Sequence, residues 1–131
     1  MKEVEEMIKK FEEFKLKWMK INESDIFDWI CLQDNMDDKV IELSSQYYLE
    51  KEAIEWDTDS KFLELSSMKT EDWKKMYTDS QSKAMVDQGL RERREKQILL
   101  KATIDRLRAK SSKIPDLTNA VKLYLKKDCT I

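Results

Sequence analysis

A single glycine and a single proline in 131 residues are the strongest constraint on what this chain folds into. Hairpin turns and open loops depend on these two residue types, so a sheet protein of this length needs several of each. A helical chain does not need them. Glu, Lys, Leu, Met and Ala, which favour helices, dominate the middle of the sequence. The composition therefore predicts an all-α fold.

Apolar residues recur at steps of three and four along the chain, the spacing of helices in a bundle or coiled coil. The length suits one helical domain over 1–131. We therefore predict a small helical bundle or hairpin with a long, partly coiled-coil helix. The predicted helices cover about 2–21, 38–56, 71–113 and 116–126.

Capping residues set the expected ends of these helices. Asn22 or Ser24 is placed to cap the helix that follows the first segment. Ser66, Ser67 or Thr70 is placed to cap the helix predicted from about residue 71. The tripeptide at 78–80, Thr-Asp-Ser, marks either a kink or a new cap.

Gly89 and Pro115 lie within or beside the longest periodic run. A glycine inside a helix permits a bend or a close contact, and a proline ends a helix or lies in its first turn. Most aromatic residues have core spacing, and we expect them to pack inside: Phe11, Phe14, Trp18, Trp29, Tyr47, Trp56 and Trp73.

The sequence gives little support for a catalytic or metal-binding function. The sequence has no histidine, the usual general base and metal ligand, and one glycine cannot form a glycine-rich phosphate loop. We expect no enzyme activity and no cofactor. Cys31 and Cys129 are far apart and form no Cys-x-x-Cys pair, which is typical of a reduced cytoplasmic protein, in the host cytoplasm if the source is viral. No apolar run reaches the roughly 18 residues of a membrane span.

The charge is distributed unevenly. Residues 1–90 hold 13 basic and 22 acidic side chains, a net of −9, whereas residues 91–131 hold 12 basic and 5 acidic, a net of +7. Such asymmetry indicates either a basic arm for a polyanion or two parts that neutralise each other.

The basic residues concentrate at 91–113, RERREKQILLKATIDRLRAKSSK. With a seam through Leu90, Gln97, Ile104 and Leu107, they fall mainly on the flanks of one helix. The flanks of the two preceding helices offer lysines and no carboxylate, so we expect the strip either to stay free or to be a solvated helix face with local pairs such as Asp105 with Arg108. A free strip would suit several phosphates of a nucleic acid. The predicted nucleic-acid-binding residues are Arg91, Arg94, Lys101, Arg108, Lys110 and Lys113.

The block at 76–125 resembles the C-terminal half of UvsY-type phage recombination mediators. The resemblance rests on Tyr77 and Asp79 in a turn, a long helix through Leu107, and the basic turn RAKSSKI at 108–114. It implies a helical homo-oligomer that binds single-stranded DNA and helps to load a recombinase. The stretch at 58–69, where that family carries a basic, tyrosine-rich segment, is mostly acidic or polar here.

Two functions remain open from the sequence. The first is a non-enzymatic accessory protein for recombination, whose expected partners are single-stranded nucleic acid and a recombinase or other protein, with no membrane. The second is a helical protein–protein interaction module, an adaptor or inhibitor whose acidic N-terminal part docks a partner protein.

Overall fold

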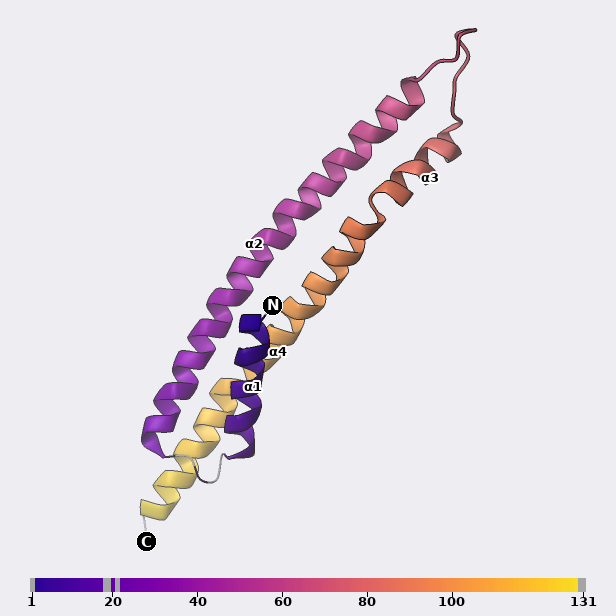
Figure 1. Cartoon of the computed structure of the whole chain (residues 1–131). Helices are drawn as coiled ribbons and strands as arrows, with labels where there is room; N and C mark the ends of the chain where they lie inside the picture. Colours follow the sequence, from indigo (N-terminus) through magenta and orange to yellow (C-terminus); the bar gives the residue numbers. More distant parts are fainter. Residues whose placement is uncertain (1, 18–19, 21, 130–131) are drawn as a thin grey trace. The chain divides into compact units, whose positions relative to one another are not determined.

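The computed structural model of this chain describes residues 2–17, 20 and 22–129, the last three of them by their backbone alone. These residues form four helices and no strand, which confirms the all-α prediction (Figure 1). The helices are α1 (Lys2–Leu16), α2 (Glu23–Ser67), α3 (Asp79–Gly89) and α4 (Arg91–Cys129). Two of them are long, with 45 residues in α2 and 39 in α4.

The chain divides into two compact units. The first unit combines Met1–Ser44 with Ala102–Ile131, and therefore holds α1, the beginning of α2 and the end of α4. The second unit is Ser45–Lys101, with the rest of α2, α3 and the beginning of α4. Both boundaries fall inside long helices, so α2 and α4 each contribute to both units.

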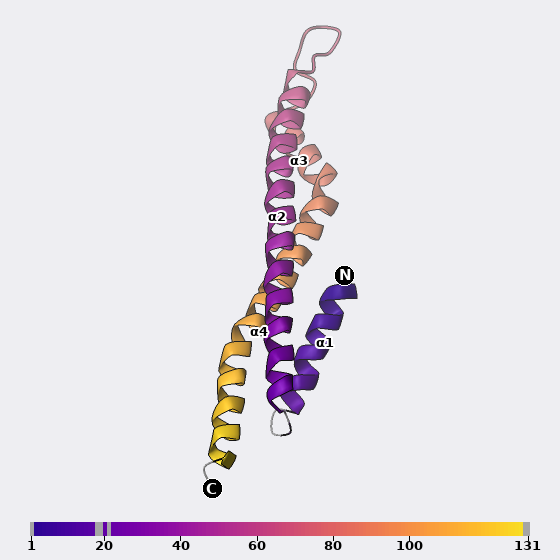
Figure 2. The same ribbon diagram turned by 90° about the vertical axis from the view of Figure 1, so that its left-hand side faces the viewer.

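The first unit has a three-helix core. Figure 2 shows α1 beside the beginning of α2, where the Phe14 and Trp29 rings lie 5.6 Å apart and Phe11 and Trp29 6.3 Å apart. Burying such rings removes large apolar areas from water and anchors the short α1. The buried apolar residues are Val4, Ile8, Phe11, Ile26, Trp29, Leu32, Met36, Val40, Leu43, Ile104, Leu107, Ile114 and Val121.

The second unit has a much smaller core. Among its described residues, only Ile54, Val86 and Leu90 are buried hydrophobic residues, with Phe62 and Leu65 packed partly against them. Two helical layers meet here instead of three. Several large hydrophobic side chains of this unit therefore stay exposed, among them Leu49, Trp56 and Leu63.

Helix α2 is longer than the helix predicted over 38–56. It begins after Asn22, whose side chain accepts from the Asp25 N–H (3.1 Å) while the Asp25 carboxylate accepts from the Asn22 N–H (3.0 Å). This reciprocal pair is a capping box, so the predicted cap at Asn22 is confirmed. Core spacing then continues through Trp29 and Met36, which leaves no reason for the helix to start at 38.

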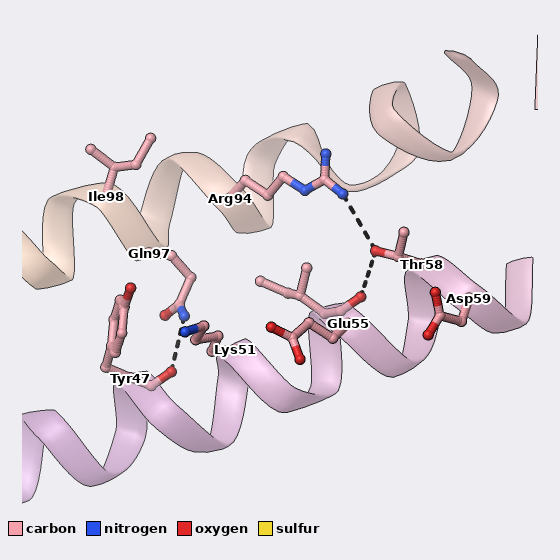
Figure 3. A pocket seen from close by; sticks show the side chains of 9 residues that line it. Tyr47, Lys51, Glu55, Thr58, Asp59, Arg94, Gln97 and Ile98 are labelled. Carbon is pink, nitrogen blue, oxygen red and sulfur yellow. Dashed lines mark hydrogen bonds between the residues drawn. The ribbon is translucent and has the colours of Figure 1, made fainter. Parts of the chain in front are cut away.

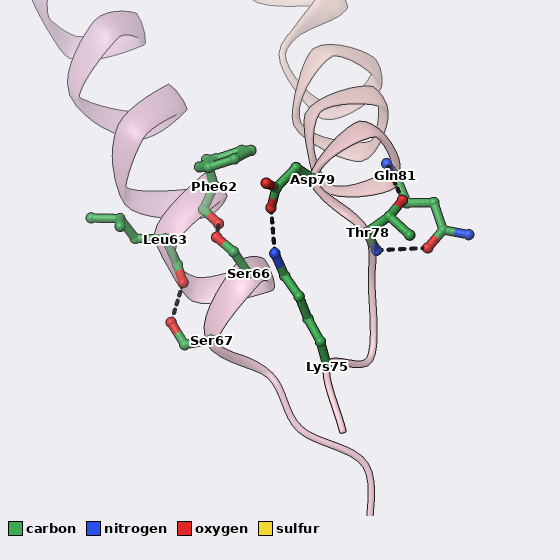
Figure 4. Close-up of polar contacts among 8 residues, drawn as sticks. All are labelled: Phe62, Leu63, Ser66, Ser67, Lys75, Thr78, Asp79 and Gln81. Carbon is green, nitrogen blue, oxygen red and sulfur yellow. Dashed lines mark hydrogen bonds and ion pairs between the residues drawn. The ribbon is translucent and has the colours of Figure 1, made fainter. Parts of the chain in front are cut away.

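The prediction of one helix over 71–113 is wrong at its N-terminal end. Ser66 and Ser67 do not cap it, because their hydroxyls donate back to carbonyls of the last turns of α2. The next helix starts only after Thr78, which forms a capping box with Gln81 (Figure 4). The indication of a new cap at 78–80 is thereby confirmed.

The long run is also interrupted at Leu90, which separates α3 from α4 with φ −102° and ψ 1°. The Leu90 N–H still donates to the Val86 carbonyl, and its own carbonyl accepts from Arg94. The interruption is thus a local bend. A Cβ placed on Gly89 would meet nothing within 4 Å, so the glycine serves no close contact.

Pro115 neither ends a helix nor starts one, contrary to the separate helix predicted over 116–126. It lies inside α4, although its ring removes one backbone donor. The buried neighbours Ile114 and Val121 hold the segment against the core, and the Thr118 hydroxyl donates to the Ile114 carbonyl at 3.0 Å. Packing therefore outweighs the local cost.

Helix α1 ends at Leu16 instead of about residue 21. The expected core residue Trp18 lies outside the described residues. Among the other predicted core aromatics, Phe11 and Trp29 are buried and Phe14 and Tyr47 half-buried. The prediction is wrong for Trp56 and Trp73, which are 74% and 84% exposed.

The core assignment of the first unit predicts how leucine truncations in α4 will behave. Leu107→Ala should lower the free energy of unfolding by about 2–5 kcal/mol, since Leu107 is fully buried. Leu123→Ala, at an exposed position of the same helix, is the matched control and should change it by less than about 0.5 kcal/mol. Urea denaturation followed by circular dichroism measures both, and equal losses would contradict the assignment.

Candidate functional site

Half of the six residues predicted to bind nucleic acid pair with carboxylates. In the second unit, Arg91 pairs with Glu95 on its own helix at 3.3 Å, and Arg94 pairs with Asp87 at 3.0 Å. Lys101 is exposed and has no ion pair with any described residue. Of these three predicted phosphate-binding residues, only Lys101 therefore forms no ion pair with a described residue.

In the first unit, one of the three predicted residues pairs with a carboxylate. Lys110 pairs with Glu12 of α1 at 2.7 Å and lies 5.2 Å from the centre of the Phe11 ring. The Arg108 guanidinium reaches the Ser44 hydroxyl at 3.5 Å. Lys113 is exposed and acts on Glu12 electrostatically.

The expectation that no acidic flank faces the strip is wrong. Besides Glu12, α1 supplies Glu5, whose carboxylate lies 3.7 Å from the Arg106 guanidinium. A strict seven-residue repeat places these two glutamates of α1 off the flanks of the helix that face the strip. A real helix has 3.6 residues per turn, so its facing residues drift away from such a repeat.

The Arg93 guanidinium ties α4 to α2 inside the second unit. It donates to Glu50 at 2.7 Å and also to Asp57, one face of α2 supplying both carboxylates. These hydrogen bonds raise the pKa of Arg93 above its ordinary value. Gln97, one turn further along α4, donates to the Tyr47 carbonyl at 3.0 Å. These polar contacts fix the register of the two helices.

A groove of about 500 Å³ runs beside these contacts (Figure 3). Its hydrogen bonds hold the two helices together: Arg94 donates to the Thr58 hydroxyl (3.4 Å), which donates to the Ile54 carbonyl (2.6 Å). The lining mixes both charges with apolar atoms and holds no histidine. The lining residues are Tyr47, Lys51, Ile54, Glu55, Thr58, Asp59, Arg94, Gln97 and Ile98.

A second surface lies on α2 away from this seam. Leu49, Trp56 and Leu63 are each at least 66% exposed and follow one another at intervals of seven residues, about two helical turns. Tyr48 extends the set and makes an edge-to-face contact with Tyr47, the ring centres 5.4 Å apart. We call Tyr48, Leu49, Trp56 and Leu63 the apolar face of α2.

The charged residues within this face are acidic. Glu52 and Asp59 lie three or four residues from the apolar positions, and so share their side of the helix. The basic residues of α2 in this unit are Lys51 and Lys61, each five residues from Trp56. Five residues correspond to about 140° around a helix, so both point away from Trp56, although Lys51 is three residues from Tyr48 at the edge of the face.

The connection between α2 and α3 is a short hairpin. The Trp73 N–H donates to the Thr70 carbonyl at 2.9 Å, and the Thr70 N–H donates to the Lys74 carbonyl at 2.8 Å. Lys69 and Lys75 face each other across it in an antiparallel bridge. Lys75 also pairs with Asp79 in the first turn of α3 (Figure 4).

Trp73 occupies an unusual place in this hairpin. Its φ is +63°, a left-handed conformation that glycine or asparagine normally fills at this point of a tight turn. The side chain is nevertheless 84% exposed. Trp73 therefore carries a backbone cost without a matching gain from burial.

Sequence reasoning missed both exposed features. The seven-residue spacing of Leu49, Trp56 and Leu63 is visible in the sequence, but core and exposed stripes look alike until the partner helix is known. The hairpin contains no glycine or asparagine that would predict it, because Trp73 occupies the left-handed position where these residues normally lie.

The comparisons with known proteins yield no match, whether to protein-family models, to curated proteins or to solved structures. Within the described ranges, no helix is long and apolar enough to cross a membrane. The same part of the chain contains no group of three or more His, Cys, Asp or Glu side chains placed to hold a metal ion.

The backbone of Trp73 predicts the effect of two substitutions. Trp73→Gly should raise the free energy of unfolding by up to about 1 kcal/mol, because relief of about 1–2 kcal/mol of left-handed strain exceeds the entropic cost of glycine. Trp73→Ala keeps a Cβ and should give no such gain. Chemical denaturation measures both, and a loss of stability in both variants would assign the indole a packing role.

The ion pair of Glu12 with Lys110 predicts a pH dependence. The hydrogen bond from Lys110 holds the pKa of Glu12 below its ordinary value of 4.5 in the folded chain. Its contribution to stability is therefore present above pH 4.5 and is lost as the pH falls through the lower folded value. Glu12→Gln should flatten this acid limb in thermal melts, whereas Glu13→Gln, outside the ion pair, should leave its slope unchanged.

Proposed function

We propose that this chain is a non-enzymatic helical interaction module that binds a partner protein through the apolar face of α2. One observation supports the proposal above all: the described part of the second unit exposes more large hydrophobic side chains than it buries. Three are buried, and nine are exposed: Tyr48, Leu49, Trp56, Leu63, Trp73, Met76, Met85, Ile98 and Leu99.

Single exposed apolar residues are normal, but aligned ones have a different meaning. Leu49, Trp56 and Leu63 lie on one side of one helix, and Trp56 is of a type enriched among the residues that dominate binding energies. Helix surfaces of this kind bind partner helices through residues spaced by three, four and seven. The acidic part of the chain supplies this surface, as the adaptor hypothesis expects.

Single-stranded nucleic-acid binding by 91–113 is the second candidate. Lys101 and Lys113 favour it, since both are exposed and neither forms an ion pair among the described residues. The pairing of Arg94 with Asp87 and of Lys110 with Glu12 opposes it, because phosphates would have to displace those carboxylates.

Site-specific photo-crosslinking tests the proposal in cells that produce the protein naturally. A photoreactive phenylalanine at position 56 should give a discrete protein adduct that disappears in a Leu49→Gln/Leu63→Gln background. The same group at position 64, an exposed acidic site on the flank of α2, is the matched control.

Two results would contradict the proposal. One is an equal set of adducts from positions 56 and 64. The other is binding of a labelled 30-nucleotide single strand, measured by fluorescence anisotropy, that weakens steeply with salt and is lost in Lys101→Glu. The second result would establish the nucleic-acid candidate in its place.

A further inference from the structure

We infer that the apolar face of α2 takes one amphipathic helix of a partner protein, with an apolar seam flanked by lysine or arginine. This inference rests on the proposed function and names the chemistry of its partner. The charge pattern of the face decides among the possible occupants, because an apolar surface alone would accept many.

The length of the face defines the partner segment. Tyr48 and Leu63 are 15 positions apart, which corresponds to about 22 Å along a helix. A partner helix of about four turns covers this distance. Its apolar residues would fall between Leu49 and Trp56 and between Trp56 and Leu63, one layer at each interval.

The charges of the face determine the flanks of the partner. Glu52 lies between Leu49 and Trp56 and Asp59 between Trp56 and Leu63, whereas Lys51 and Lys61 are each five residues from Trp56 and point away from it. Carboxylates beside an apolar seam favour basic residues on the opposing helix and disfavour acidic ones. The face therefore selects its partner by charge as well as by apolar contact.

The same charges argue against other occupants. If two copies of this chain met through this face, Glu52 and Asp59 of one copy would oppose carboxylates of the other. Nucleic acids and anionic lipid surfaces require a basic contact surface, whereas the charged residues between Leu49, Trp56 and Leu63 on this face are acidic. A basic helix is the occupant that satisfies both the apolar and the acidic residues.

Two synthetic 18-residue peptides test the inference against the full chain. Both are designed helices with leucine seams, one with lysine on the flanks and the other with glutamate. Fluorescence anisotropy of the labelled lysine peptide should show saturable binding, at least about 10-fold tighter than that of the glutamate peptide. Trp56→Ala should weaken it by about 10-fold or more, as at a binding hot spot.

Matched variants separate this face from general stickiness. Ile98→Ala removes an equally exposed hydrophobic side chain from α4 and should leave the affinity unchanged. Glu52→Lys/Asp59→Lys should reverse the preference, so that the glutamate peptide binds more tightly. Circular dichroism confirms that each variant is folded.

Several outcomes would overturn the inference. They are the absence of lysine-peptide binding to the folded chain, equal binding of the two peptides, and equal losses from Trp56→Ala and Ile98→Ala. A wild-type dimer in sedimentation velocity that Trp56→Ala dissociates would make a second copy the occupant. If crosslinking at position 56 succeeds while the lysine peptide fails, the proposed function stands and this partner chemistry is rejected.

Discussion

A pair of packed helices can hide only one stripe of each helix from water, and this limit determines what the second unit exposes. The first unit buries more because α1 packs as a third helix, with Phe11 against Trp29, and most of the buried hydrophobic residues lie there. The second unit has no such third helix among its described residues. Its large side chains on the outer side of α2 therefore stay in solvent.

The ion pairs between helices hold the helices together, and they occupy charged side chains that would otherwise be free on the surface. Arg93 is held by Glu50 and Asp57, and Lys110 by Glu12, so the basic part of α4 is matched to acidic parts of α1 and α2. The uneven charge along the sequence is thus partly resolved by folding. Glu52 and Asp59, beside the apolar face of α2, are among the described residues for which no ion pair forms.

Much of the fold could be predicted from local chemistry, but the candidate site could not. The scarcity of glycine and proline led to helices, and Asn22 marked a helix start correctly. The predictions of a helix boundary at Pro115 and of a helix beginning at about residue 38 were wrong, because core packing at Ile114 and Trp29 overrides local stop and start signals. Trp56 was expected inside because spacing alone identifies a stripe without saying whether anything covers it.

At Trp73 the backbone conformation disfavours the residue that the sequence carries. The hairpin requires a left-handed residue there, which smaller side chains adopt at lower cost. A pool of random variants sorted only for resistance to unfolding would drift away from tryptophan at this position. The same pool sorted for partner capture would retain it if the indole is part of the contact, so the two enrichment profiles would diverge at this codon.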